Sequence, residues 1–256
     1  MKDLSLNAYV VYDHDMGSAT LATFTGTWFG VAARGTIQNL RWDADFVYGT
    51  KEFAGTVGGV ACAAGTICDQ SGWMFDAGVG MALPGTPLDL EVRGWWATGA
   101  DSGTGDSDAF PVVNSPDHDP GAQILTGGGA VDPGQNLAEN AQNTWGFGLI
   151  ARWTASPALK VQGNVFYVGT VEEGTATFGS PAGDAGSGTV GSALNGVSSV
   201  GTEVSVKIDY TLYKGLVATL VGGYVFLGDD TGRTPTGAVV RYDDIAKLAG
   251  QLAYAF

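Results

Sequence analysis

The chain has 256 residues, of which 15% are charged and 41 are glycine, and its formal net charge at pH 7 is −14. This negative charge argues against nucleic-acid binding, because phosphate binding requires a basic surface. A transmembrane helix needs roughly 18 consecutive apolar residues, but the longest mostly apolar run, 216–227, is interrupted by Thr219, Gly222 and Gly223. A membrane-spanning strand needs only about 9–11 residues, and every second one can be polar.

Apolar and polar residues alternate along ten segments, which is the pattern of a strand with one apolar and one polar face. The clearest alternation lies at 242–256, where Leu248 and Tyr254 fall on one face and Lys247 and Gln251 on the other. In chain order, the sequence predicts strands at 3–13, 24–37, 40–50, 72–83, 88–99, 143–155, 158–170, 202–212, 216–228 and 242–256.

The connections between these segments alternate strictly in length. The tight turns are at 38–39, 84–87, 156–157 and 213–215. The long connections are at 14–23, 51–71, 100–142, 171–201 and 229–241. Such sorting of short and long connections onto opposite ends is typical of outer-membrane barrels and has no counterpart in soluble sandwiches. We therefore predict an all-β, transmembrane, antiparallel up-and-down β-barrel that residues 1–256 form as a single domain.

The two faces of the predicted strands differ in composition. Aromatic residues gather toward strand ends on the apolar face, as in the girdles of membrane barrels, although in a soluble protein they would form a core. Charged residues fall on the other face and are expected to line a lumen, because a charge facing hydrocarbon costs a few kcal/mol at the midplane. The predicted pore-lining residues are Arg34, Arg41, Asp43, Asp45, Asp76, Glu91, Arg93, Arg152, Lys160, Lys207, Asp209 and Lys247.

Three features of the long connections are candidate sites. Asp101, Asp106 and Asp108 offer closely spaced oxygen ligands for Ca²⁺, but no Glu closes an EF-hand pattern, and a solvated loop tip is the simpler interpretation. Cys62 and Cys68 lie six residues apart and are a candidate disulfide across a loop tip.

The two histidines, His14 and His118, are each flanked by Asp residues in connections expected to be loops. A His between carboxylates could act as a base, although solvated loop histidines are far commoner. No serine-nucleophile elbow, P-loop or zinc-protease motif occurs in the sequence. The sequence therefore predicts no catalytic site and, apart from the Ca²⁺ candidate, no cofactor.

The C-terminal end carries a family resemblance. The segment Leu252-Ala253-Tyr254-Ala255-Phe256 resembles the closing strand of bacterial outer-membrane proteins, and the hairpin spanning 210–226 resembles the last hairpin of porins, including alginate-export-like ones. The resemblance implies an outer-membrane location, contacts with the bilayer and lipopolysaccharide, and recognition of Phe256 by the barrel-assembly machinery. It is also compatible with a homo-oligomer. Porins of this kind often have more than ten strands, and the sequence shows no signal peptide. The chain is thus expected to be either a whole barrel or the C-terminal part of a larger one.

Two functions are compatible with this pattern. The first is a porin-like channel for passive diffusion of small hydrophilic solutes, with anions favoured by the basic lumen residues. The second is a narrow, non-conducting barrel whose long acidic external loops bind a partner or cations. Ten strands leave a narrow lumen that side chains can largely fill. Arg41 would then pair with Asp43 or Asp45, and Arg93 with Glu91 or its neighbours.

Overall fold

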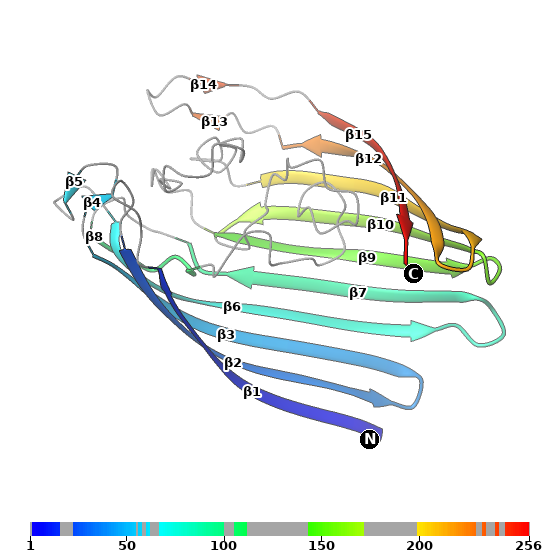
Figure 1. Ribbon diagram of the computed structural model, residues 1–256, viewed down its shortest axis with the longest axis horizontal. Coiled ribbons are helices and arrows are strands. Elements are labelled where there is room, and N and C mark those ends of the chain that lie inside the picture. Colours follow the sequence, from blue (N-terminus) through cyan, green and yellow to red (C-terminus); the bar gives the residue numbers. More distant parts are fainter. Residues whose placement is uncertain are drawn as a thin grey trace.

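Ten long strands form one antiparallel sheet in which each strand pairs with its neighbours in chain order (Figure 1). The computed structural model describes residues 2–15, 23–54, 56–57, 60–61, 67–99, 105–111, 143–171, 199–228, 232–233, 239–240 and 244–255. The ten strands are β1 (Lys2–Asp15), β2 (Thr23–Ile37), β3 (Leu40–Ala54), β6 (Ile67–Ala82), β7 (Leu88–Ala97), β9 (Thr144–Thr154), β10 (Leu159–Thr170), β11 (Ser199–Tyr213), β12 (Leu216–Leu227) and β15 (Ile245–Tyr254). All ten predicted strands are confirmed, and so is the all-β, up-and-down fold class.

The four predicted tight turns lie together at one end of the sheet, which also holds both chain termini (Figure 1). Gln38 adopts a φ of 59° in the turn between β2 and β3, and Gly215 adopts a φ of 85° in the turn between β11 and β12. Ser156 closes the turn between β9 and β10, where its hydroxyl oxygen accepts hydrogen bonds from the backbone N–H groups of Ala158 and Leu159. We call this the short-turn end and the opposite one the long-connection end.

Several strands, including β3, β6 and β11, are longer than the sequence pattern indicated. β3 continues to Ala54 and β6 begins at Ile67, because backbone pairing extends through Lys51 with Gln70 and Glu52 with Asp69. Alternation fades there because Lys51, Glu52, Asp69 and Gln70 put polar side chains on both faces, whereas ladder hydrogen bonds need no particular side chain. Five short strands were also not predicted: β4 (Thr56–Val57), β5 (Val60–Ala61), β8 (Gly105–Ser107), β13 (Gly232–Arg233) and β14 (Val239–Val240).

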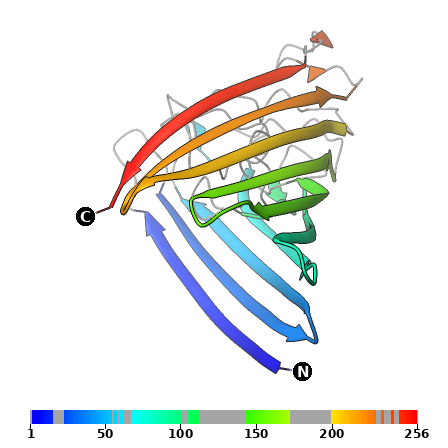
Figure 2. The same ribbon diagram turned by 90° about the vertical axis from the view of Figure 1, so that its right-hand side faces the viewer.

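The sheet is strongly curved (Figure 2). Its convex face is apolar, because most of the exposed large hydrophobic side chains lie there. Phe29, Phe147 and Trp153 on this face are 52%, 56% and 48% exposed. Aromatic rings also associate here across strands: Trp73 stacks on Trp96 with ring centroids 4.3 Å apart. These rings are therefore not the buried core that a soluble sandwich would require.

The buried core lies on the concave face, in the half toward the long-connection end. Its largest members are Trp28 on β2, Trp95 on β7 and Phe166 on β10. Trp95 lies over Gly146, and Phe166 lies over Gly148, so that a Cβ at either glycine would come within 2.3 Å of a ring atom. A face expected to be polar throughout thus has an apolar layer in one half. This half also holds the fully buried Glu203, which lies opposite Phe166 and Val225, whereas the network of paired arginines lies in the other half.

The two outer strands, β1 and β15, do not pair with each other, so the sheet is open within the part of the chain that is described. Among these same residues, no helix is long and apolar enough to cross a membrane.

Candidate functional site

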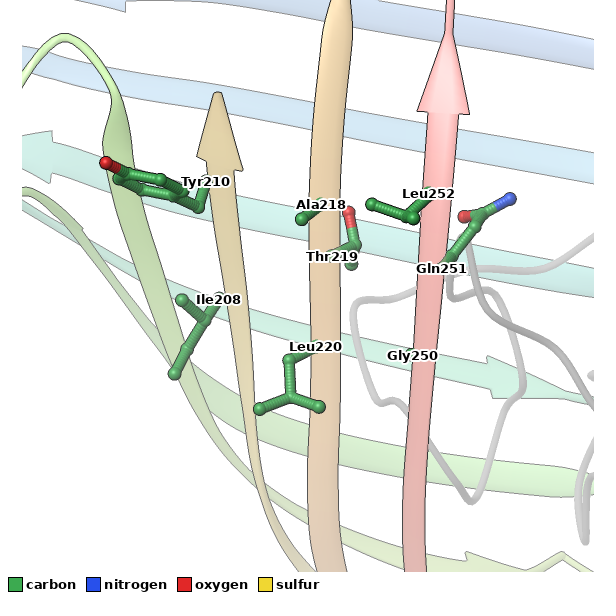
Figure 3. Close-up of a pocket in the computed structure, with 8 residues that line it drawn as sticks. All are labelled: Ile208, Tyr210, Ala218, Thr219, Leu220, Gly250, Gln251 and Leu252. Carbon is green, nitrogen blue, oxygen red and sulfur yellow. The ribbon is translucent and has the colours of Figure 1, made fainter. Parts of the chain in front are cut away.

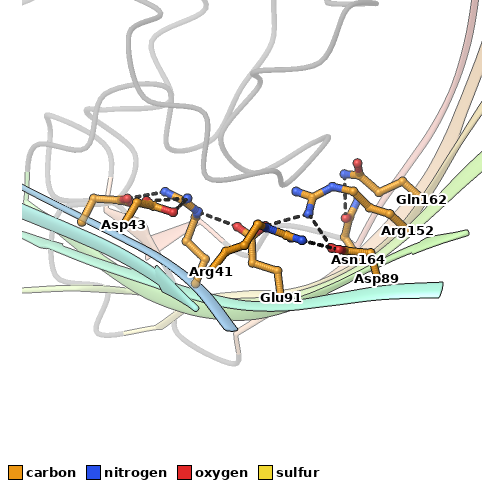
Figure 4. A network of polar contacts seen from close by, with 9 residues as sticks. Arg41, Asp43, Asp89, Glu91, Arg152, Gln162 and Asn164 are labelled. Carbon is orange, nitrogen blue, oxygen red and sulfur yellow. Dashed lines mark hydrogen bonds and ion pairs between the residues drawn. The ribbon is translucent and has the colours of Figure 1, made fainter. Parts of the chain in front are cut away.

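A network of ion pairs covers the concave face near the short-turn end, and we call it the arginine ladder (Figure 4). Its members are Arg41, Asp43, Asp76, Asp89, Glu91, Arg93 and Arg152. They come from four adjacent strands, β3, β6, β7 and β9, and alternate strand positions bring all of them to one face.

Arg41 on β3 reaches over β6 to form a two-pronged ion pair with Asp89 on β7. The distances from Nη1 to Oδ2 and from Nη2 to Oδ1 are 2.5 and 2.8 Å. Gly80 on β6 makes this reach possible, because a Cβ there would lie 2.8 Å from Arg41 Nη2. The pairing expected from the sequence, with Asp43 or Asp45, is therefore wrong.

Arg93 on β7 contacts three carboxylates at once. Its Nη2 lies 2.7 Å from Asp43 Oδ2, its Nε lies 3.0 Å from Glu91 Oε1, and its Nη1 bonds Asp76. Gly78 on β6 leaves room for the guanidinium group, since a Cβ at that position would lie 2.9 Å from Nη2. For a filled lumen the sequence predicted a pair between Arg93 and Glu91 or its neighbours, and the Arg93–Glu91 pair is present.

Arg152 on β9 joins the two halves of the ladder. Its Nη1 lies 2.6 Å from Glu91 Oε2 and 3.6 Å from Asp89 Oδ1. Three guanidinium groups thus face four carboxylates, so the ladder carries a formal excess of one negative charge. The ladder's arginines are compensated, and they give this part of the wall no net positive charge.

An uncharged polar row continues the ladder onto β10 and β11. Gln162 Nε2 donates to Asn164 Oδ1 at 2.9 Å, and Asn164 Nδ2 donates to Ser205 Oγ at 3.2 Å. Neither these three residues nor Asp89 was among the predicted lumen residues. Position parity was sufficient to find Asp89, because it lies on the same face as Glu91 and Arg93.

The remaining predicted lumen residues fall outside the ladder. Asp45 accepts a hydrogen bond from the Tyr9 hydroxyl at 3.2 Å, and Lys207 lies 3.8 Å from Asp209. Within the described ranges, Arg34 and Lys160 are exposed and have no ion-pair partner. Lys247 lies on β15 and is half-buried. The role of all these residues in lining a pore stays a prediction.

The segment Asp108–Pro111 lies against the concave face toward the long-connection end. Trp28 Nε1 donates a hydrogen bond to the Pro111 carbonyl oxygen at 2.6 Å, and the Phe110 N–H donates to the Thr98 carbonyl oxygen at 3.0 Å. The segment approaches β6 so closely that a Cβ at Gly72 would lie 2.6 Å from Phe110 N. Phe110 is 6% exposed, so this part of the long connection closes over the apolar layer.

The candidate metal and disulfide sites fall largely outside the described residues. Asp101 and Cys62 are outside the described residues. Asp106 lies in β8, and Asp108 is exposed. Cys68 lies near the start of β6. Among the residues that are described, no group of three or more His, Cys, Asp or Glu could hold a metal ion. The Ca²⁺ site and the disulfide stay predictions.

The structure changes the interpretation of His14. It lies in β1 rather than in a loop, and its Nδ1 is 3.0 Å from Thr25 Oγ1. Successive strand residues point to opposite faces, so Asp13 does not lie beside the imidazole. The prediction that His14 is a loop residue beside Asp13 is wrong. His118 lies outside the described residues.

Comparison with known proteins gives structural likeness only. No family model matches the chain, and no curated protein matches it. The chain is similar to the NanC porin at 6% sequence identity and a TM-score of 0.41, over 99% of this chain and 94% of that one. It is similar to OccK11 (OpdR) of Pseudomonas aeruginosa at 13% identity and a TM-score of 0.47, over 99% of this chain and 62% of that one. It is similar to OccK9 (OpdG) of the same organism at 11% identity and a TM-score of 0.27, over 98% of this chain and 77% of that one.

The chain therefore spans less than two thirds of the length of OccK11. At these identities and TM-scores, the fold assignment rests on the strand order and registers of the chain itself.

Proposed function

We propose that this chain is an outer-membrane, porin-like channel for the passive diffusion of small hydrophilic solutes. The observation that carries the proposal is the division between the two faces of one ten-stranded sheet, apolar and aromatic on the convex side and charged on the concave side. A soluble protein rarely exposes so large a contiguous apolar surface. In a bilayer that apolar surface contacts lipid, and in a closed barrel the arginine ladder lies in the polar interior.

The proposed contacts of the barrel follow from this location. The convex face would contact the bilayer and lipopolysaccharide, and the barrel-assembly machinery would recognise Phe256. The aspartates of the long connections would face the exterior, where Ca²⁺ is a candidate ligand. A homo-oligomer is compatible with the convex surface.

Charge selectivity in the proposed channel would come from Arg34 and Lys160 rather than from the ladder. Rings of side-chain charge tune the selectivity of pores, and compensated arginines contribute little to such a field. Arg34 and Lys160 are exposed and have no ion-pair partner among the described residues. They support a modest preference for anionic solutes.

Reversal potentials in planar bilayers test this assignment. We expect the double variant Arg34→Ser/Lys160→Ser to shift the reversal potential toward cation preference, because two uncompensated cations leave the lumen wall. The matched control is Lys214→Ser, which removes one cation from the exposed turn between β11 and β12. An unchanged potential in the double variant, or an equal shift in the control, contradicts the assignment.

A second candidate function is a narrow, non-conducting barrel whose external loops bind a partner or cations. The apolar layer around Trp28, Trp95 and Phe166 favours it, because these side chains and the Asp108–Pro111 segment occupy much of the concave face. Single-channel conductance separates the two functions. Steady conductance steps from the purified chain support the channel, and their consistent absence after verified insertion supports the binding barrel.

A further inference from the structure

An open apolar groove lies on the convex face of β11, β12 and β15, toward the short-turn end (Figure 3). Its floor is formed by the small residues Ala218 on β12 and Gly250 on β15, and an ideal Cβ at Gly250 would have its nearest neighbour 3.8 Å away. Ala218 lies between Tyr210 and Leu252, which are 47% and 69% exposed and form the two walls.

The floor of the groove is aligned with the membrane normal of the proposed barrel. Opposite residues on neighbouring strands lead from Ser5, near the short-turn end of β1, to Ile245, at the long-connection end of β15. Rows across the strands therefore climb toward the long-connection end, because the strands themselves tilt by about 35–45°. From Ala218 to Gly250 the floor advances two residues along the strands, or about 6.6 Å, and one strand across them, or about 4.8 Å. Since these two steps lean in opposite directions, the floor stays within about 10° of the normal.

The same line, continued toward the short-turn end, leads to the turn between β11 and β12. This turn holds Lys214, which lies four residues before Ala218 and about 10 Å farther toward the short-turn end. Lys214 is exposed and has no ion-pair partner within the part of the chain that is described. It is the only charged residue in the four tight turns, and the convex-facing positions of β11, β12 and β15 carry no charge. An uncompensated cation thus stands at the end of an apolar groove.

Exposed tyrosines mark the level of Lys214 as a membrane interface. Tyr213 is 74% exposed and Tyr254 is 60% exposed. The Tyr254 ring lies beside the turn, since an ideal Cβ at Gly215 would be 3.5 Å from its Cε2. Tyrosine is enriched at this level of membrane proteins, because its ring contacts hydrocarbon while its hydroxyl group reaches the polar headgroups. Lipid headgroups are therefore expected beside Lys214, with their hydrocarbon chains directed toward Ala218.

We propose that the groove and Lys214 together bind one anionic phospholipid from the leaflet on the short-turn side. One acyl chain lies over Ala218 and Gly250, between Tyr210 and Leu252, and the headgroup phosphate pairs with the Lys214 ammonium group. The inference rests on the membrane location proposed above, and it adds a lipid of defined charge at a defined place on the wall.

A second copy of the chain is the other candidate occupant, and the size of the groove argues against it. The groove is lined by eight residues, whereas a stable protein interface takes roughly 20–30 residues from each partner. A single acyl chain runs along the membrane normal, as the floor of the groove does. Charge complementarity favours an anionic lipid over a neutral one, because a neutral headgroup brings its own cation to the phosphate and gains less from Lys214.

Native mass spectrometry of the full chain, released from detergent micelles, tests the proposal. The probes are phosphatidylglycerol, whose headgroup is anionic, and phosphatidylcholine with the same acyl chains, whose headgroup is neutral overall. We expect one retained phosphatidylglycerol, bound about fivefold more tightly than phosphatidylcholine, which is the effect of one lysine near an anionic lipid. Lys214→Gln should remove this preference. The matched control, Lys2→Gln, removes a cation at the same end of the sheet but on β1, and it should leave the preference intact.

A second pair of variants tests the groove itself. Gly250→Leu fills the floor with a side chain and should weaken the binding of both lipids at least about fivefold, because the acyl chain can no longer be buried there. The matched control is Gly163→Leu on the convex face of β10, outside the groove, where nothing lies within 4 Å of an ideal Cβ. It should bind both lipids as the unaltered chain does. The charge-state distribution of each lipid-free variant verifies that the variant is folded.

Equal retention of the two phospholipids by the unaltered chain overturns the role of Lys214, and so does an equal loss of preference in Lys2→Gln. Unchanged binding in Gly250→Leu overturns the groove as the site of the acyl chain. A second copy of the chain retained in place of lipid overturns the choice of occupant. Each of these results leaves the membrane location standing, whereas a folded monomer that stays dissolved without detergent refutes that location and the channel with it.

Discussion

The hydrogen bond between Trp28 and Pro111 should hold the Asp108–Pro111 segment in place, and Trp28→Phe tests this. The Nε1-to-oxygen distance is 2.6 Å and the pair is buried. The substitution removes the indole N–H donor and leaves the buried Pro111 carbonyl oxygen without this hydrogen bond. Such a loss costs about 1–3 kcal/mol of stability. If this cost falls on the docked state, the undocked population of the segment rises at least about fivefold.

Thiol labelling measures that population directly. Ala109 is fully buried in the docked segment, so Ala109→Cys, in a background without Cys62 and Cys68, should react with a polar maleimide only after undocking. The labelling rate should rise at least about fivefold when Trp28→Phe is added.

The matched control is Trp95→Phe. Trp95 is also buried on the concave face, but its Nε1 donates to Thr144 Oγ1, within the wall, at 3.0 Å. Loss of the Trp95–Thr144 hydrogen bond should destabilise the wall without releasing the Asp108–Pro111 segment. Equal labelling rates in the two variants would refute the proposed role of the Trp28 hydrogen bond.

Two further predictions concern the arginine ladder, and both are measured as shifts in the urea midpoint of the chain refolded in vesicles. Arg93→Gln should lower the free energy of unfolding by about 3 kcal/mol, because it leaves the poorly solvated carboxylate of Asp76, whose side chain is 9% exposed, without its cation. Arg41→Gln should cost about 1 kcal/mol or less, since that side chain is 48% exposed. Similar losses for both would contradict the central position of Arg93. Gly78→Val should also be destabilising, because a side chain at this position would displace the Arg93 guanidinium, whereas Gly163→Val should be tolerated, because nothing lies within 4 Å of an ideal Cβ there. A stable Gly78→Val variant with an intact ladder would show that the close approach is not required.

Much of the fold could be predicted from the sequence because its signals are local. Alternation fixes each strand and its faces, and turn residues such as Gln38-Asn39 and Gly215 mark where the chain reverses. The ends of β3 and β6 were missed because backbone pairing there continues through polar residues.

The candidate site could be predicted only as a set of residues on one face. Pairing Arg41 with Asp89 requires the registers of three strands and the absence of a side chain at Gly80, neither of which follows from spacing along one strand. Parity likewise assigned Trp28 and Arg34 to the same face without showing that buried apolar side chains gather in one half of that face and the paired arginines in the other. The docking of Phe110 and Pro111 could not be predicted because it depends on a contact with Trp28, which lies more than 80 residues away along the chain.

The apolar layer and the arginine ladder follow one another along the wall, and in the proposed channel a solute would meet them in turn. Apolar constrictions in pores form barriers by dewetting. The barrier is higher for a permeant that binds its hydration water more strongly. Small, tightly hydrated ions would therefore be slowed at the Trp28–Trp95–Phe166 level whatever the sign of their charge. Organic solutes with both hydroxyl groups and hydrocarbon surface would cross that level more readily, so hydration energy would separate permeants that charge alone does not distinguish.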